Sequence, residues 1–297
     1  MSVSGTEEKL WFVMQSNWHE MRISTVFALV ICQLDIGCSI FLLTHFSTFL
    51  HEEHFDALKG TCKHPQRAKS WCIMFCHPLP LNALPDTPFP FLEEDPNLPP
   101  FPLIFQDELI GCLNAAHATD LKTCHSKAGL VVLFCFATIT WESHIWAVVA
   151  TSLTEAEFYL SVTSGKIAKY LHCILAALDA LQPDPMCLFI DNMTAFHVIN
   201  EKHPTPCAWY IGIQHFAIQE RCKKQDLVME HLSGILNPSD DLTKPLWWVL
   251  HARHAHCSLA PHMRLLCSPI CPLETHKAGE GDGAWFKSNC QSWGIQD

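Results

Sequence analysis

Between residues 103 and 246 the chain alternates short apolar segments with longer amphipathic ones. The short segments are rich in β-branched and aromatic residues, which predicts strands over residues 103–117, 129–136, 137–143, 186–192 and 226–234. The longer segments repeat apolar residues at helical spacing, which predicts helices over residues 154–181, 193–200, 204–222 and from 237 onward. Thr154 and Glu157 have the spacing of a capping box at the start of the first helix. This order of strands and helices predicts an α/β domain.

The N-terminal part of the chain has a different pattern. Residues 22–49 are strongly apolar, but Asp35 lies in the middle of the run and Gln33 and His45 interrupt it. The uninterrupted stretch is shorter than the ~20 residues that a bilayer requires. We therefore expect a buried or amphipathic helix here, and no interaction with a membrane.

Two further segments lack regular periodicity. Residues 78–102 hold many prolines, which exclude a helix or a central strand and predict an extended linker. The residues after 248 show no helical or strand pattern. The predicted organisation is therefore an N-terminal helical part (1–77), a linker (78–102), an α/β domain (103–248) and an irregular tail (249–297).

The charged residues limit the possible partners. The formal net charge is −11, and only five of the 19 basic residues are Arg. Binding to phosphate backbones requires clustered Lys and Arg, so tight binding of nucleic acid through charge alone is not expected. Arg codons that begin with CG become Cys, Trp, His or Gln codons by single transitions, and Cys, His and Trp are all plentiful. This skew is typical of mutational decay.

The 16 cysteines do not predict a secreted disulfide scaffold. Their spacing is irregular, and the first nine residues contain two Glu and no signal-peptide pattern. We expect an intracellular protein, in the cytoplasm or the nucleus, with mostly reduced thiols. The sequence makes no prediction about the oligomeric state.

Acidic residues stand at three of the predicted strand–helix junctions: Glu157, Asp191, and Asp240 beside Asp241. Carboxylates that converge in space bind hard divalent cations such as Mg²⁺, and two such ions can support phosphodiester cleavage. Each residue also has a purely structural interpretation. Glu157 fits a capping box, Asp191 fits a strand end or helix cap, and Asp240 fits the first turn of a helix.

Several segments, taken in order, resemble the C-terminal part of copia-type retrotransposon Pol polyproteins. Residues 34–60 resemble the last helices of the reverse transcriptase domain. The ribonuclease H domain is matched by Asn114–Phe134, Ser152–Phe158, Ile190–Asn192, Phe216–Glu220 and Leu236–Leu246. The resemblance covers roughly residues 22–256. It implies a ribonuclease H-like fold, with a mixed five-stranded sheet flanked by helices, preceded by a partial reverse transcriptase tail.

The resemblance also implies an activity and its residues. The family cuts the RNA strand of an RNA–DNA hybrid with Mg²⁺, or Mn²⁺, held by four carboxylates. The second, third and fourth acids correspond to Glu157, Asp191 and Asp240, and Asp241 is a possible substitute for the fourth. The first acid is replaced by Asn114, whose amide brings no negative charge. We therefore expect impaired cleavage and weakened binding of the hybrid.

Three alternatives remain open from the sequence. The domain could bind nucleic acid without cutting it, or it could be an inert translated remnant. A zinc site could form at one of two clusters, although neither has paired zinc-finger spacing: His251, His254, His256 and Cys257, or Cys72, Cys76 and His77.

Overall fold

A computed structural model describes residues 5–31, 33–44, 46, 51–67, 73, 108–120, 123–135, 137–180, 182–201 and 212–259. The chain divides into two compact units, whose described residues lie within 1–72 and within 73–275. The predicted linker (78–102) and the end of the predicted tail (260–297) lie outside the described residues.

The N-terminal unit is helical. It consists of α1 (Gly5–Ile31), the short helix η1 (Leu34–Ile36), α2 (Gly37–Thr44) and α3 (Glu52–Arg67). The helices share a core of buried apolar side chains: Trp18, Ile36, Ile40, Leu43, Ala57 and Leu58. The expected helix over residues 22–49 is thus divided between the end of α1, η1 and α2. No helix in the described part of the chain is both long and apolar enough to cross a membrane.

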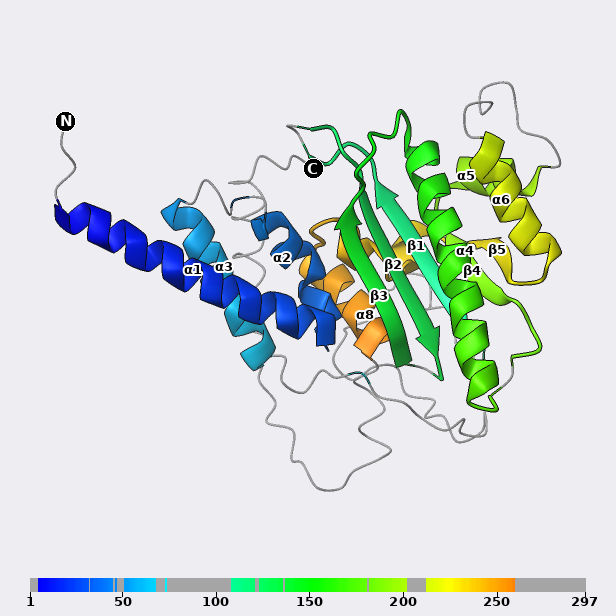
Figure 1. Cartoon of the computed structure of the whole chain (residues 1–297), viewed down its shortest axis with the longest axis horizontal. Helices are drawn as coiled ribbons and strands as arrows, with labels where there is room; N and C mark the ends of the chain where they lie inside the picture. Colours follow the sequence, from blue (N-terminus) through cyan, green and yellow to red (C-terminus); the bar gives the residue numbers. More distant parts are fainter. Residues whose placement is uncertain are drawn as a thin grey trace. The chain divides into compact units, whose positions relative to one another are not determined.

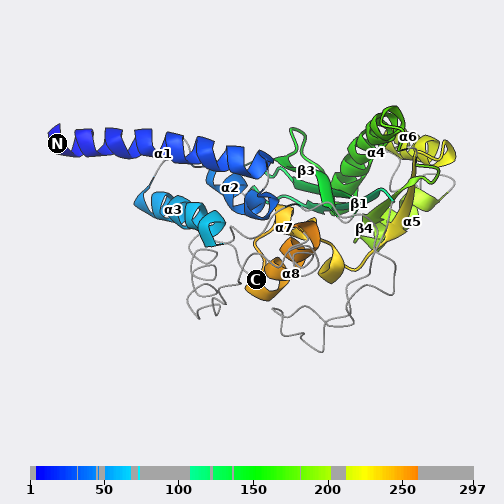
Figure 2. The same cartoon turned by 90° about the horizontal axis from the view of Figure 1, so that it is seen from below.

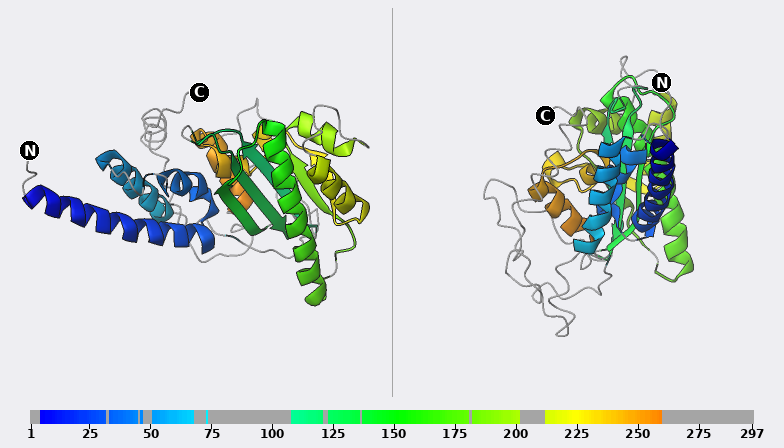
Figure 3. Two further views of the ribbon diagram at one scale, coloured as in Figure 1. Left: turned by 45° about the horizontal axis from the view of Figure 1, so that its top comes forward. Right: turned by 90° about the vertical axis from the view of Figure 1, so that its left-hand side faces the viewer.

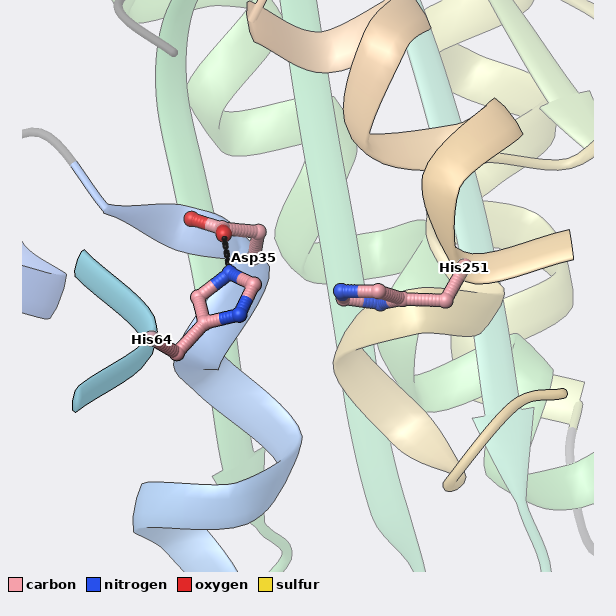
Figure 4. A group of neighbouring side chains, drawn as sticks. All are labelled: Asp35, His64 and His251. Atoms are coloured by element: carbon pink, nitrogen blue, oxygen red, sulfur yellow. Dashed lines mark hydrogen bonds and ion pairs between the residues drawn. The ribbon is translucent and has the colours of Figure 1, made fainter. Parts of the chain in front are cut away.

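A hydrogen bond between Asp35 and His64 connects two helices of this unit. The Asp35 carboxylate lies 2.6 Å from Nε2 of His64 on α3, and the Asp35 side chain is fully buried. Figure 4 draws this pair with a dashed line. A buried carboxylate requires such a partner, because desolvation otherwise disfavours its charged form. Asp35 therefore fastens η1 to α3.

The second unit is built on a five-stranded sheet. Its strands are β1 (Ile110–Ala116), β2 (Lys127–Phe134), β3 (Ala137–Ile145), β4 (Met186–Ile190) and β5 (Leu227–His231), and they lie in the order β3-β2-β1-β4-β5. The β1–β2 and β2–β3 pairs are antiparallel, whereas the β1–β4 and β4–β5 pairs are parallel. The central strand β1 is buried at every position but the last, as expected for a strand covered on both faces.

Helices cover both faces of the sheet. They are α4 (Leu153–Ala177), α5 (Met193–Asn200), α6 (Gly212–Lys223), η4 (Gly234–Leu236), α7 (Asp240–Thr243) and α8 (Trp248–Leu259). Figure 2 shows α4 and α6 on one side of the sheet and α7 and α8 on the other. The left view in Figure 3 shows the length of α4 across the strands. The mixed sheet flanked by helices confirms the predicted ribonuclease H-like α/β fold.

The structure corrects the predicted start of α4. Ser152, and not Thr154, is the N-cap, because its hydroxyl accepts a hydrogen bond from the backbone N–H of Glu155 at 3.1 Å. The Glu155 carboxylate in turn accepts from the N–H of Thr151 at 2.6 Å. The cap therefore uses Glu155. Glu157 therefore does not cap the helix. It lies two residues further along, on a different face of α4, and is fully buried.

The structure also corrects the predicted end of the domain. The expected single helix from residue 237 is divided into α7 and α8, separated by Pro245, which lacks an N–H and cannot continue a helix. Residues 248–259 form regular helix where an irregular tail was expected. The buried face of α8 carries small and polar residues, so it gives no apolar periodicity: His251, Ala252, His254, Ala255 and Ser258.

Candidate active site

The parallel pair β1–β4 brings two of the candidate residues to one edge of the sheet. Its register aligns Leu113 with Ile190, so Asn114 and Asp191 are the next residues along neighbouring strands. The turn at η4 closes against Asp191, since a β-carbon placed on Gly234 would lie 3.3 Å from Oδ2 of Asp191. Nε2 of His231 lies 3.2 Å from the backbone oxygen of Asp191. Asp191 is thus held between β4, β5 and η4.

The segment that carries Asp240 is fastened to β1 by Asn237. The Asn237 amide donates a hydrogen bond to the backbone oxygen of Leu113 at 2.8 Å. Its side-chain oxygen accepts from the Ser239 hydroxyl at 2.6 Å and from the Ser239 N–H at 3.2 Å. On β3, the Ser143 hydroxyl donates a hydrogen bond to the backbone oxygen of Leu242 at 2.8 Å. These bonds place the start of α7 directly over β1 and β2.

Gly129 makes this close approach possible. It pairs with Asn114 across β1 and β2. A β-carbon at Gly129 would lie 2.7 Å from Cγ2 of Thr243 and 2.8 Å from the backbone oxygen of Ser239. Because one of these atoms belongs to the backbone, α7 would have to move to accommodate any other residue.

Gly129→Ala is therefore expected to destabilise the protein by about 1–3 kcal/mol, the usual cost of overpacking. Gly165→Ala in α4 is the matched control. There the nearest atom to the new β-carbon would be the end of the Leu227 side chain at 3.1 Å, and helix propensity favours Ala. Urea unfolding of both variants measures the difference. Equal midpoints would contradict the close packing of α7 on β2.

Asn114 and Asp240 are in direct contact. The Asn114 amide nitrogen donates to Oδ1 of Asp240 and, at 2.8 Å, to the hydroxyl of Thr243. All three side chains are buried. An ionised carboxylate can only accept hydrogen bonds, so Asp240 fixes the orientation of the amide with its NH₂ group inward. Nζ of Lys244 lies 2.7 Å from the other oxygen, Oδ2, of Asp240.

Glu157 approaches the same cluster from the first turns of α4. Its side chain is fully buried and lies close to the side chains of Asp191 and Asn192. Burial, followed by the charge of Asp191 and a smaller effect of Asp240, raises the pKa of Glu157 to about 9. Glu157 therefore carries a proton at neutral pH in the metal-free protein.

The two aspartates respond to the same surroundings. Burial raises the pKa of Asp240 to about 6, although the neighbouring Lys244 opposes the shift. Burial also raises the pKa of Asp191, and Lys244 again opposes it. The cluster thus combines a Glu157 that is protonated at neutral pH with Asp191, Asp240 and the basic side chain of Lys244. Mutually perturbed carboxyl groups of this kind are typical of functional sites.

These residues do not fit a pair of divalent ions in the arrangement observed. A cation between two ligands requires oxygen atoms on both sides, but the Asn114 amide directs its hydrogens at Asp240. The second oxygen of Asp240 is engaged by Lys244. Three of the four positions implied by the family are carboxyl groups, and the fourth carries a hydrogen-bond donor in the position of a ligand.

Asp241, the possible substitute for the fourth acid, is directed elsewhere. Its Oδ1 lies 2.5 Å from Nδ1 of His251 on α8, and both side chains are buried. His251 is one member of the first zinc cluster considered above and is the third residue drawn in Figure 4. Its neighbour His254 is fully buried, with no hydrogen-bond partner for either ring nitrogen among the described residues. The second zinc cluster lies outside the described residues.

Three contributors to the site were not predicted from the sequence. Lys244 lies four residues after Asp240, the spacing at which opposite charges meet on a helix, and this signal could have been used. Asn237 and Gly129 gave no comparable signal, because their roles depend on how α7 crosses β1 and β2.

Comparison with known proteins finds a similar retrotransposon polyprotein. The chain is 23% identical over 221 residues, 74% of its length, to the retrovirus-related Pol polyprotein from transposon TNT 1-94 of Nicotiana tabacum. The matched region spans only 14% of that polyprotein. No protein-family model matches the chain.

Solved structures that match part of the chain include ribonucleases H. One is LC11-RNase H1, isolated from compost by a metagenomic approach, with a TM-score of 0.37, 12% identity, and coverage of 46% of this chain and 94% of that chain. The same ribonuclease was also solved in complex with an RNA/DNA hybrid, with a TM-score of 0.35, 13% identity, and coverage of 46% and 94%. The fold is assigned from the strand order β3-β2-β1-β4-β5 and the helices on both faces of the sheet. The chain is therefore related to the Pol polyproteins of retrotransposons, and its sheet unit has a ribonuclease H-like fold.

Proposed function

We propose that the sheet unit derives from the ribonuclease H domain of a copia-type retrotransposon. Its ancestral reaction is hydrolysis of the RNA strand of an RNA–DNA hybrid, supported by two divalent ions. In this chain Glu157, Asp191 and Asp240 are the remaining acids, and Asn114 stands in place of the first. Cleavage is therefore impaired, and the scarcity of Arg weakens binding of the hybrid. We propose that the protein acts inside the cell, in the cytoplasm or the nucleus.

One observation carries this proposal. Asn114 lies on the central strand β1 and contacts Asp240. The register of β1 and β4 also places it beside Asp191. This contact supports the proposal that Asn114 occupies the position of the first acid without its charge. A change from Asp to Asn replaces an oxygen that carries charge with an NH₂ group of nearly the same size and shape.

Asn114→Asp is expected to raise the rate of hybrid cleavage by roughly a hundredfold, the order of magnitude that one preorganised electrostatic group contributes. The assay uses the full chain, a labelled RNA–DNA hybrid, and Mg²⁺ or Mn²⁺. The matched control is Asn200→Asp, which adds the same charge at an exposed position of α5. Addition of Asp191→Asn to the first variant should abolish the gain.

The outcomes separate the alternatives. Cleavage by the natural protein at the rate of Asn114→Asp contradicts the assignment of the lesion. A folded Asn114→Asp variant that binds the hybrid but does not cut it supports a binding module instead. If no variant binds or cleaves the hybrid, the result supports an inert translated remnant.

A further inference from the structure

Both carboxylate oxygens of Asp240 are engaged by donors from this chain. Asn114 on β1 donates to Oδ1, and Lys244, at the end of α7, lies 2.7 Å from Oδ2. The Asp240 side chain is only 4% exposed, whereas the Lys244 side chain is 46% exposed. The ammonium group thus reaches the buried carboxylate from the solvent side, as a soluble cation would.

The Asn114 amide has a second acceptor within the same helix. Its nitrogen lies 2.8 Å from the hydroxyl of Thr243, and that hydroxyl donates to the backbone oxygen of Asp240 at 3.1 Å. Both hydrogens of the amide are therefore used, and both bonds run from β1 to α7. A buried donor with all its bonds made contributes to stability, whereas a buried carboxylate without a partner is costly.

We propose that Asn114 and Lys244 together act as an internal substitute for a metal cation at Asp240. In this role they hold α7 on β1 without a divalent ion, so that folding of the natural protein does not depend on metal. The proposal rests on the proposed function only in treating the cluster as a former metal site. Lys244 is a positioning residue here, because it acts through Asp240.

Asn114→Asp should reverse this arrangement. The substitution places a carboxylate against the Asp240 carboxylate in a buried position and removes the amide bond to Thr243. Like charges at this distance disfavour each other, and a divalent cation is the partner that satisfies both. The fold of the variant should therefore become dependent on metal.

Calorimetric melting of the full chain tests this, in EDTA and with millimolar Mg²⁺ or Mn²⁺. The natural protein should melt at the same temperature in both conditions. Asn114→Asp should melt lower in EDTA by roughly 5 °C, and Mn²⁺ should restore most of the loss. A natural protein that gains as much from Mn²⁺ as Asn114→Asp does overturns the proposal.

The role of Lys244 is tested by titration with Mn²⁺. The double variant Asn114→Asp/Lys244→Met should bind Mn²⁺ about tenfold more tightly than Asn114→Asp alone, because the competing ammonium group is gone. The matched control is Lys224→Met. Lys224 directly follows α6 and forms a similar pair with Glu220, four residues before it, but both side chains of that pair are exposed. Equal effects of Lys244→Met and Lys224→Met on the affinity overturn the role of Lys244.

These readouts are separate from cleavage. Metal-dependent melting of Asn114→Asp without hybrid cleavage supports the internal cation substitute and contradicts the proposed function. Restored cleavage without metal-dependent melting supports the proposed function and contradicts the internal cation substitute.

Discussion

Glu157→Gln is expected to stabilise the metal-free protein by about 3 kcal/mol at neutral pH. Burial beside Asp191 raises the pKa of Glu157 to about 9 in the folded state, from 4.5 for an unperturbed Glu. Folding at neutral pH therefore requires that Glu157 take up a proton, and this uptake costs free energy. Glutamine has a similar shape and carries no ionisable proton, so the variant avoids the cost.

The sign of the pH dependence follows from the same shift. Between about pH 4.5 and pH 9 the folded state binds one more proton than the unfolded state, so the contribution of Glu157 to stability falls as the pH rises. Urea unfolding in EDTA at about pH 5 and about pH 8 should show this fall in the natural protein and a smaller one in Glu157→Gln. The control is Glu230→Gln on β5, whose side chain is exposed. A Glu157→Gln variant that is less stable than the natural protein at about pH 8 would show that Glu157 is ionised and paired in the fold.

His254→Leu is expected to raise the free energy of unfolding by about 2 kcal/mol at about pH 5. Burial lowers the pKa of His254 to about 3, and the nearby charges of His251, Arg253 and Lys244 add to the shift. Below the unfolded pKa of 6.5, the unfolded state binds a proton that the folded state excludes. The contribution of His254 is therefore fully present above about pH 6.5 and is lost progressively as the pH falls toward 3.

Acid unfolding followed by circular dichroism measures this effect. His254→Leu should unfold at a lower pH than the natural protein and should also be more stable at neutral pH, because two buried ring nitrogens without partners are removed. His197→Leu on the exposed side of α5 is the control and should leave the acid transition in place. An unchanged acid midpoint in His254→Leu would mean that another group drives the transition.

The strands and α4 could be predicted because their hydrophobic pattern is regular and their burial is one-sided or complete. The start of α4 could not be decided, because Ser152 with Glu155 and Thr154 with Glu157 have the same capping spacing. Packing of α4 on the sheet determines which pair caps the helix, because Glu157 lies on the buried face and is not available as a cap. α8 was missed because histidines and small residues occupy its buried face, where a pattern search expects Leu, Ile or Val.

The candidate site was predictable as a set of positions but not as a set of interactions. The order of Asn114, Glu157, Asp191 and Asp240 along the chain came from the resemblance to copia-type polyproteins. From the sequence, Asn114 is interpreted as a missing metal ligand. In the structure, its side chain makes two hydrogen bonds that connect β1 to α7. Such contacts depend on the crossing of α7 over β1, which is fixed by Asn237 and Gly129 and leaves no periodic signal in the sequence.

The ratio of hybrid-cleavage rates between Asn114→Asp and the natural protein, measured with Mn²⁺ under identical conditions, shows whether Asn114 disables a ribonuclease H site. We predict a ratio of roughly one hundred, with Asn200→Asp indistinguishable from the natural protein. A ratio near one, with both proteins folded and cutting the hybrid, would contradict the claim that Asn114 disables a ribonuclease H site.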